Sequence, residues 1–408
     1  MKTLLACGLA ALPLLGAMAA LAQTPAAPPA DKPAPPPPIT APFIIHHIVN
    51  GIGQGYSQVI ADFNHDGKPD IAALGLTADA IYWYENPYWT PHLIITAKDA
   101  PKPVYMDAAD IDGDGIPEIL LAFHFNTDPH KDSGTVAILH HDGDPRRPWK
   151  IDRVIDNVPS DHRVRFADIN GNGKQAIVIA PILAGTATGF PDPDHNVTPL
   201  FVYRAENGWK REIITLENHG VSHGLNIQAL SGPSQAVMTS GYEGTAIHEF
   251  RDGKWIRTPL TPGKDAPWPS GGSSDVMFGH LGNKRFYVTI EPFHGNMVVV
   301  HMPDGKGGYA RQVIDDQLAN GHALTLVDAD GDGNDEIVAG GNRSSQSMYF
   351  YKATDATGQN WIRFQMDDDM APAACHTVDL KGTGKLTDVV CLDMRDPGWL
   401  KWYEYKRP

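Results

Sequence analysis

The sequence predicts an all-β fold built from seven repeated units. The first observation is a short acidic loop followed at once by an apolar, β-branched strand. It is clearest at residues 328–336, with acids at positions 1, 3, 5 and 9 and Gly333 at position 6. The second observation is that related loops recur about every 50 to 60 residues, a period typical of repeat architectures. The third is that four strand-like stretches fit within most periods.

The acidic loops have the composition of calcium sites. Calcium takes six to eight oxygen ligands, and a glycine lets a short loop wrap tightly around one ion. In an EF-hand the last acid stands at position 12 and helices flank the loop, whereas here the last acid is at position 9 and strands flank it. We expect structural Ca²⁺ ligands in four loops: Asp62, Asn64, Asp66 and Asp70; Asp110, Asp112, Asp114 and Glu118; Asp168, Asn170 and Asn172; and Asp328, Asp330, Asp332 and Glu336.

Three further copies of the loop have lost ligands. The loop that begins at Asp379 has Lys381 at position 3, and the copies at residues 228–232 and 279–283 lack the acids. Each is still followed by a strand-like stretch, so the three copies keep the period without predicting a calcium site.

The N-terminus has the pattern of an export signal. Lys2 precedes an apolar stretch that ends in Ala20-Leu21-Ala22, which predicts a signal peptide over residues 1–22. The alternative, a membrane anchor, is disfavoured because the apolar run is short and contains Pro13. Residues 23–42 are rich in proline and alanine and predict an extended linker, which leaves 43–408 for the repeats. We expect a secreted or periplasmic protein.

The charge and hydropathy of the chain limit the classes of partner that it can bind. The formal net charge of −15 argues against nucleic acid, which requires a basic surface. No stretch after the leader is apolar enough to span a membrane, and we expect a monomer or a weak oligomer.

Cys375 and Cys391 flank the last loop symmetrically, so they would face each other across a hairpin. A disulfide and a pair of buried thiols both remain open.

The two ends of the chain predict how the repeat closes. Residues 43–49 have the pattern of a fourth strand with no unit before them, and residues 402–405 have the pattern of a third strand with none after them. Pairing the two stretches would complete the seventh unit and remove exposed sheet edges.

Histidines gather on one face of the predicted fold. In antiparallel four-stranded units, the loops between second and third strands and those between units lie opposite the calcium loops. Half of the 18 histidines fall on that face: His124, His130, His162, His195, His219, His223, His294, His322 and His376. His162 and His322 each precede the first calcium-loop Asp of their unit by six residues, and His223 is close to the equivalent place. With Tyr105 and Arg163, this set suits general acid–base chemistry, or zinc held by three imidazoles.

The loop pattern D-x-D-x-D-G-x-x-E followed by a strand resembles the FG-GAP/VCBS repeat family, whose units are similar to the blades of integrin-type β-propellers. The resemblance covers nearly the whole chain after the leader. It implies a seven-bladed β-propeller with calcium loops between the first and second strands of several blades. It does not imply an activity, because propellers carry many functions.

A second resemblance is weaker and more specific. Residues 82–87, 160–163 and 321–322 look like the propeller domain of aldos-2-ulose dehydratase, and the set is similar in style to seven-bladed polysaccharide lyases. This resemblance implies a lyase or dehydratase that acts by β-elimination on a sugar or glycan.

The resemblance also implies catalytic roles. His162 or His223 would be the base, Tyr105 the acid, Arg163 the group that holds the developing oxyanion, and His322 a second base or a metal ligand. The alternatives are a non-catalytic propeller that binds a glycan or a protein partner, and a metal-dependent hydrolase built on the histidines.

Overall fold

The computed structural model describes residues 39–268, 270–342 and 347–406. The predicted signal peptide and the predicted linker as far as residue 38 lie outside this part of the chain. The described residues form strands, turns and one short 3₁₀ helix, η1 (Ala205–Asn207), and include no α-helix. Accordingly, none of their helices is long and apolar enough to cross a membrane.

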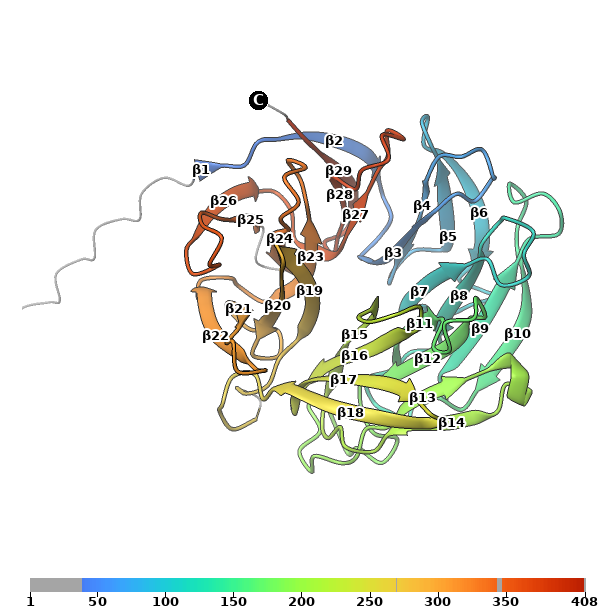
Figure 1. Ribbon diagram of the computed structural model, residues 1–408. Helices are drawn as coiled ribbons and strands as arrows, with labels where there is room; N and C mark the ends of the chain where they lie inside the picture. Colours follow the sequence, from blue (N-terminus) through green and yellow to red (C-terminus); the bar gives the residue numbers. More distant parts are fainter. Residues whose placement is uncertain (1–38, 269, 343–346, 407–408) are drawn as a thin grey trace, which may run out of the picture. The chain divides into compact units, whose positions relative to one another are not determined.

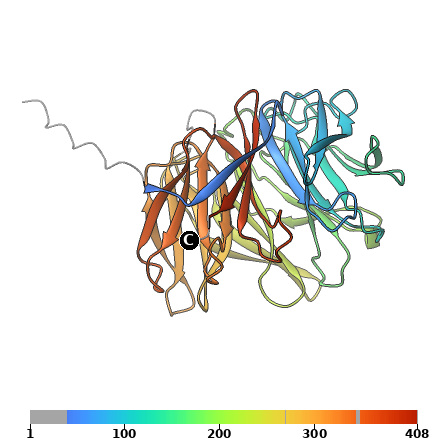
Figure 2. The same ribbon diagram turned by 90° about the horizontal axis from the view of Figure 1, so that it is seen from above.

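The strands form seven antiparallel sheets, which we call blades 1 to 7, arranged around a central axis (Figures 1 and 2). Blade 1 contains β3 (Gly55–Ala61), β4 (Asp70–Gly75), β5 (Ala80–Glu85) and β6 (Thr90–Thr96). Blade 2 contains β7 (Tyr105–Ala109), β8 (Glu118–Phe123), β9 (Thr135–His140) and β10 (Lys150–Asp156). Blade 3 contains β11 (Asp161–Ala167), β12 (Ala176–Pro181), β13 (Leu200–Tyr203) and β14 (Arg211–Thr215).

The remaining blades repeat this arrangement. Blade 4 contains β15 (Ser222–Ala229), β16 (Gln235–Gly241), β17 (Gly244–Arg251) and β18 (Lys254–Thr261). Blade 5 contains β19 (Asp275–Leu281), β20 (Lys284–Glu291), β21 (Met297–Pro303) and β22 (Tyr309–Asp315). Blade 6 contains β23 (Gly321–Val327), β24 (Glu336–Gly341), β25 (Ser347–Ala353) and β26 (Trp361–Asp367). Blade 7 contains β27 (Pro372–Val378), β28 (Asp388–Asp393), β29 (Trp399–Tyr405) and, from the other end of the chain, β2 (Phe43–Asn50).

The first strands of the blades line the axis. They contact one another in the cyclic order β3, β7, β11, β15, β19, β23, β27 and back to β3, which closes the ring. The fold is therefore a seven-bladed β-propeller, as the repeat pattern and the resemblance predicted. All seven loops singled out in the sequence connect the first two strands of a blade.

The N-terminal strand pairs with the C-terminal strand. β2 runs antiparallel to β29 from Phe43 opposite Tyr405 to Asn50 opposite Trp399, and Figure 1 shows these two strands side by side in blade 7. Ahead of it, β1 (Ile39–Thr40) pairs in parallel with the outer strand of blade 6. The predicted linker extended to residue 42, whereas its last residues lie in this strand because they find a free sheet edge there.

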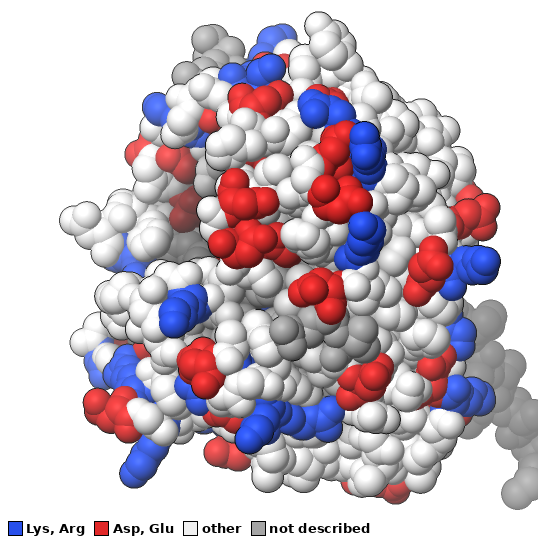
Figure 3. All heavy atoms as spheres, turned by 90° about the vertical axis from the view of Figure 1, so that its right-hand side faces the viewer, with Lys and Arg blue, Asp and Glu red and all other residues white. Residues whose placement is uncertain are grey.

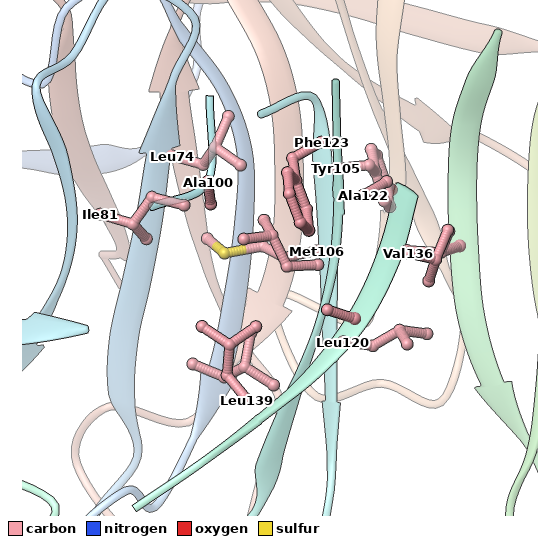
Figure 4. Close-up of a cluster of buried hydrophobic side chains, with 14 of the residues drawn as sticks. Leu74, Ile81, Ala100, Tyr105, Met106, Leu120, Ala122, Phe123, Val136 and Leu139 are labelled. Carbon is pink, nitrogen blue, oxygen red and sulfur yellow. The ribbon is translucent and has the colours of Figure 1, made fainter. Parts of the chain in front are cut away.

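Apolar side chains fill the space between neighbouring blades. Leu74 and Ile81 of blade 1 face Met106 and Phe123 of blade 2, and the four side chains are at least 96% buried (Figure 4). Aromatic side chains of third strands also lie in such contacts, and Trp83 of β5 is completely buried. The hydrophobic effect favours burial of these faces, and it holds each sheet against the next.

Blade 7 carries a disulfide. Cys375 of β27 and Cys391 of β28 are direct cross-strand partners, and their sulfur atoms are bonded. Both residues lie in a buried apolar cluster with Met348. Of the two states that the sequence left open, the structure has the bonded one.

Candidate functional site

An extra residue interrupts the pairing near the start of five innermost strands. In each case two residues of the first strand face one residue of the second, which is a β-bulge, a device that redirects a side chain. The extra residues are Tyr56 in β3, His162 in β11, His223 in β15, His322 in β23 and Ala373 in β27. Four of the five carry a ring that can exchange protons or bind a metal, and all stand at the same end of the channel.

The redirected side chains meet. The ring of His223 lies 5.0 Å from that of His162 and 5.1 Å from that of His322, measured between ring centroids. His294, from the loop between β20 and β21, joins them, with its Nε2 3.1 Å from Nε2 of His223. On the other side, the Tyr56 hydroxyl lies 2.8 Å from Nε2 of His162. We call these five residues the imidazole cluster.

Backbone carbonyls fix two of the rings. Nδ1 of His223 donates to the carbonyl oxygen of Ser274 at 2.8 Å, and Nδ1 of His322 donates to that of Ala373 at 2.7 Å. A carbonyl can only accept, so both neutral rings carry their proton on Nδ1 and a lone pair on Nε2. This arrangement is typical of metal-ligating histidines. One ring nitrogen from each of His223, His294 and His322 lies within 4.8 Å of the other two.

Burial keeps His162 and His223 uncharged. His162, His223 and His322 are each 1% exposed. Burial lowers the pKa of His162 and of His223 well below the usual value, and the positive charge of Arg163 lowers both further. Neutral imidazoles are ready metal ligands, but they are weak bases. These three histidines are therefore interior and not surface residues, because the bulges turn them inward.

Tyr105 and Arg163 lie deeper in the channel. The Arg163 guanidinium stands over the Tyr105 ring at 4.5 Å, and Arg165 donates to the Tyr105 hydroxyl at 2.5 Å. They line a cavity of about 400 Å³ together with Asp107, Asp275 and His376. Burial raises the pKa of both aspartates and lowers that of His376 to about 3. Within the predicted catalytic set, His162, His223 and His322 thus come together in the cluster, while Tyr105 and Arg163 line the cavity, which His322 also borders.

The other predicted histidines have separate surroundings. Nδ1 of His124 lies 3.4 Å from Asp132, and that of His219 lies 3.6 Å from Glu243. Nε2 of His130 lies 3.1 Å from the Ala187 carbonyl, and the ring of His195 lies 4.4 Å from that of Tyr242. Their clustering on one face is thus not a single site.

Sequence reasoning missed Tyr56 and gave His294 no role. Tyr56 precedes Asp62 by six residues, the same spacing that singled out His162 and His322, so the period itself could have identified it. His294 comes from a loop between the second and third strands of its blade, which has no fixed spacing to the first residue of an acidic loop. Only the fold brings it to the cluster.

The acidic loops curl as predicted, but their side chains differ in placement. Carboxylate oxygens of Asp110, Asp112 and Asp114 gather within 4.8 Å, and so do those of Asp328, Asp330 and Asp332. In blade 1 the Asp70 carboxylate is buried and accepts the backbone N–H groups of Phe63 and Asn86. In blade 3, where asparagines occupy positions 3 and 5, Asp168 accepts from the backbone of its own loop.

Charged side chains on the outer surface are mixed in sign. Figure 3 shows groups of acidic side chains with lysines and arginines between them, and no continuous basic stripe on that face. Paired charges such as Arg146 with Glu85, at 2.6 Å, belong to this surface.

Fold and site together define the class: a seven-bladed β-propeller that gathers histidines and a tyrosine at one end of its channel. Residues 62–121 match the model of the FG-GAP-like repeat, and residues 133–304 match that of the aldos-2-ulose dehydratase β-propeller domain. Both resemblances inferred from the sequence are thereby confirmed. The second match includes His162, His223 and His294 but ends before His322. No curated protein sequence matches the chain.

Proposed function

We propose that the protein is an exported, carbohydrate-directed carbon–oxygen lyase of the dehydratase type, with the imidazole cluster as its site. The observation that carries this proposal is the hydrogen bond between Tyr56 and His162 beside three further imidazoles. A proton-transfer pair next to a set of metal ligands is the equipment that β-elimination from a carbonyl compound requires. The match to a dehydratase propeller supports the same reaction class.

His223, His294 and His322 would hold a zinc ion. The fit rests on the ring orientations, because the Ser274 and Ala373 carbonyls leave the lone pairs of His223 and His322 on Nε2. A zinc ion bound there would polarise a substrate carbonyl oxygen and make the neighbouring C–H more acidic.

Tyr56 and His162 would move the proton. In a dehydration the C–H bond next to the carbonyl breaks, a C=C bond forms, and the C–O bond one carbon further on breaks. Neutral His162 can share a proton with the Tyr56 hydroxyl over 2.8 Å, so the pair can take the proton from carbon and return it to the departing hydroxyl, which leaves as water. Tyr56 thus replaces Tyr105 as the acid, because Tyr56 is hydrogen-bonded to His162, whereas the hydroxyl of Tyr105 is bonded to Arg165.

Arg163 would favour negative charge on the substrate. Its guanidinium lies beneath the cluster, and its Nε donates to the His223 carbonyl at 3.3 Å. A fixed positive charge in a buried site stabilises an oxyanion as it develops.

Two structural expectations accompany this proposal. Calcium would bind the blade 1 loop, where Asp62, Asn64 and Asp66 offer oxygen ligands, and pairing of β2 with β29 would keep the ring closed. Export is supported by the leader pattern and by the Cys375–Cys391 disulfide, since such bonds persist in oxidising compartments.

Incubation with candidate substrates tests the function. The pure, zinc-loaded protein would be given keto-sugars and uronic polysaccharides, and unsaturated carbonyl products would be followed by ultraviolet absorption. We expect turnover by the parent and at least a hundredfold loss in His162→Gln, as is typical when a proton-transfer group is removed. Binding of a sugar without any turnover would contradict the lyase and favour a glycan-binding propeller.

A further inference from the structure

Blades 2 and 6 carry the same acidic loop in the same geometry. Each ends in a glutamate that is nearly completely buried, Glu118 at 2% and Glu336 at 1% exposed. Oε2 of Glu118 accepts the N–H of Ile111 at 2.9 Å, and Oε2 of Glu336 accepts that of Ala329 at 3.0 Å. The two loops therefore have the same acids at positions 1, 3, 5 and 9 and the same glutamate contact. They differ in the residue that faces them.

In blade 6 a lysine faces the loop. Nζ of Lys352 donates to Oε1 of Glu336 at 2.9 Å, also contacts Asp330, and lies 3.5 Å from Asp332. The ammonium group thus lies among the carboxylates and supplies the positive charge that a bound cation would bring.

In blade 2 the equivalent residue is a histidine. Ile119 pairs with Leu139 as Ile337 pairs with Tyr351, so His140 stands where blade 6 has Lys352. Oε1 of Glu118 is buried and accepts no hydrogen bond from any described residue. Nδ1 of His140 lies 3.7 Å from this oxygen, and one ligand atom each from Asp112, Glu118 and His140 lies within 4.8 Å of the others.

We propose that the blade 2 loop binds a divalent transition-metal ion, with Asp112, Glu118 and His140 as ligands, in the position that the Lys352 ammonium fills in blade 6. A cation would stabilise a buried carboxylate oxygen that is aimed into a loop of like charge. Calcium prefers oxygen ligands alone, whereas an imidazole favours zinc and its neighbours in the first transition series.

The adjacent His141 is not a ligand in this proposal. Its Nδ1 accepts the N–H of Gly143 at 3.1 Å, so the neutral ring carries its proton on Nε2. That nitrogen lies 3.1 Å from Oδ2 of Asp114. The neutral ring of His141 therefore has no lone pair on Nε2 to offer to the ion.

Calorimetric titration would test the site. The chelator-treated full chain would carry His294→Ala, which removes one ligand from the imidazole cluster, and would be titrated separately with Zn²⁺, Mn²⁺ and Ca²⁺. We expect Zn²⁺ or Mn²⁺ to bind more tightly than Ca²⁺, with at least about tenfold weaker binding when His140→Gln is added. His280→Gln is the matched control, because Nδ1 of exposed His280 also lies 3.7 Å from a carboxylate, that of Asp335.

Exchanging the two facing residues gives a second readout. His140→Lys should abolish the metal-induced rise in melting temperature at this loop, and Lys352→His should add a metal equivalent at blade 6. Transition-metal binding that is unchanged by both His140→Gln and His140→Lys would overturn the proposal, and so would binding of Ca²⁺ alone. Neither result would bear on the dehydratase, whose site lies at the other end of the channel.

Discussion

The Tyr56 hydroxyl and Nε2 of His162 lie 2.8 Å apart, although 106 residues separate them in the chain. The two residues belong to blades 1 and 3, so their contact passes over the innermost strand of blade 2 and spans part of the channel mouth. The bulges of β3 and β11 set the two residues apart from the regular pairing of their strands.

Removal of this hydroxyl should impair the reaction and not the fold. In Tyr56→Phe the buried ring remains, so we expect a melting temperature close to that of the parent and a loss of 10²- to 10⁴-fold in kcat. Tyr82→Phe removes a hydroxyl from a partly exposed ring of the same blade and serves as the control. Full activity in Tyr56→Phe would exclude the pair from proton transfer.

Calcium should stabilise the protein through blade 1. Asp66 offers a carboxylate at position 5 of this loop, so Asp66→Ala should reduce the calcium-dependent rise in melting temperature. At a hundredfold excess over Kd, a single site adds about 2.7 kcal/mol to the free energy of unfolding.

Asp379→Ala is the control for that measurement. Asp379 accepts backbone N–H groups from Thr383 and Gly384, and Lys381 stands at position 3, so this variant should lose stability but keep its calcium response. If neither calcium nor a chelator changed the melting temperature of the parent, calcium binding would be refuted.

Loss of β2 should open the ring. A chain that begins at Gly51 leaves β29 as an exposed edge and removes the contacts of Phe43 with Phe350 and Tyr405. We expect a lower melting temperature and a tendency to aggregate, measured by calorimetry and light scattering. A chain that begins at Phe43 retains β2 and should behave as the parent; equal stability of the two would show that closure by β2 is dispensable.

Reduction of the disulfide should destabilise blade 7. Cys375 and Cys391 are 16 residues apart, and a cross-link over a loop of about this length contributes about 3 kcal/mol. A reductant should therefore lower the melting temperature of the parent. The double variant Cys375→Ala/Cys391→Ala should melt at a lower temperature than the oxidised parent, and its melting temperature should not change with reductant.

Acid should weaken the fold through buried histidines. Burial lowers the pKa of His248 from 6.5 to about 3, so between these values the unfolded chain binds the proton and the folded chain does not. The free energy of unfolding should fall as the pH falls from about 6.5 toward 3. His248→Gln should reduce that slope by up to about 1.4 kcal/mol per pH unit, measured by denaturant titration at several pH values.

The repeat made the fold predictable. Loops with glycine and acids at fixed spacing, followed by β-branched strands, identified the hairpins of most blades, and the repeat period identified the two whose loops lack the acids. The unpaired patterns at both ends indicated the partners β2 and β29. These features are local or periodic, so a single chain contains them. The state of Cys375 and Cys391 depended on oxidation chemistry that spacing does not encode.

The site was only partly predictable, because its geometry depends on backbone irregularity. Position in the repeat identified His162, His223 and His322, but a regular strand would not have turned them inward, and the bulges leave no mark that spacing reveals. For the same reason Tyr105 was assigned to a group that it does not join. The strand register was needed to see that Lys352 and His140 each face the acidic loop of their own blade.

The bulges have a consequence for how this propeller can diversify. The backbone, and not the side chain, creates the inward-facing position, and the same position recurs in five blades with Tyr, His, His, His and Ala. Substitution at one such position changes one member of the cluster and leaves sheet pairing untouched. A lineage with this ring can therefore exchange one chemistry for another in single steps, and alanine at position 373 marks a place where a functional side chain is not in use.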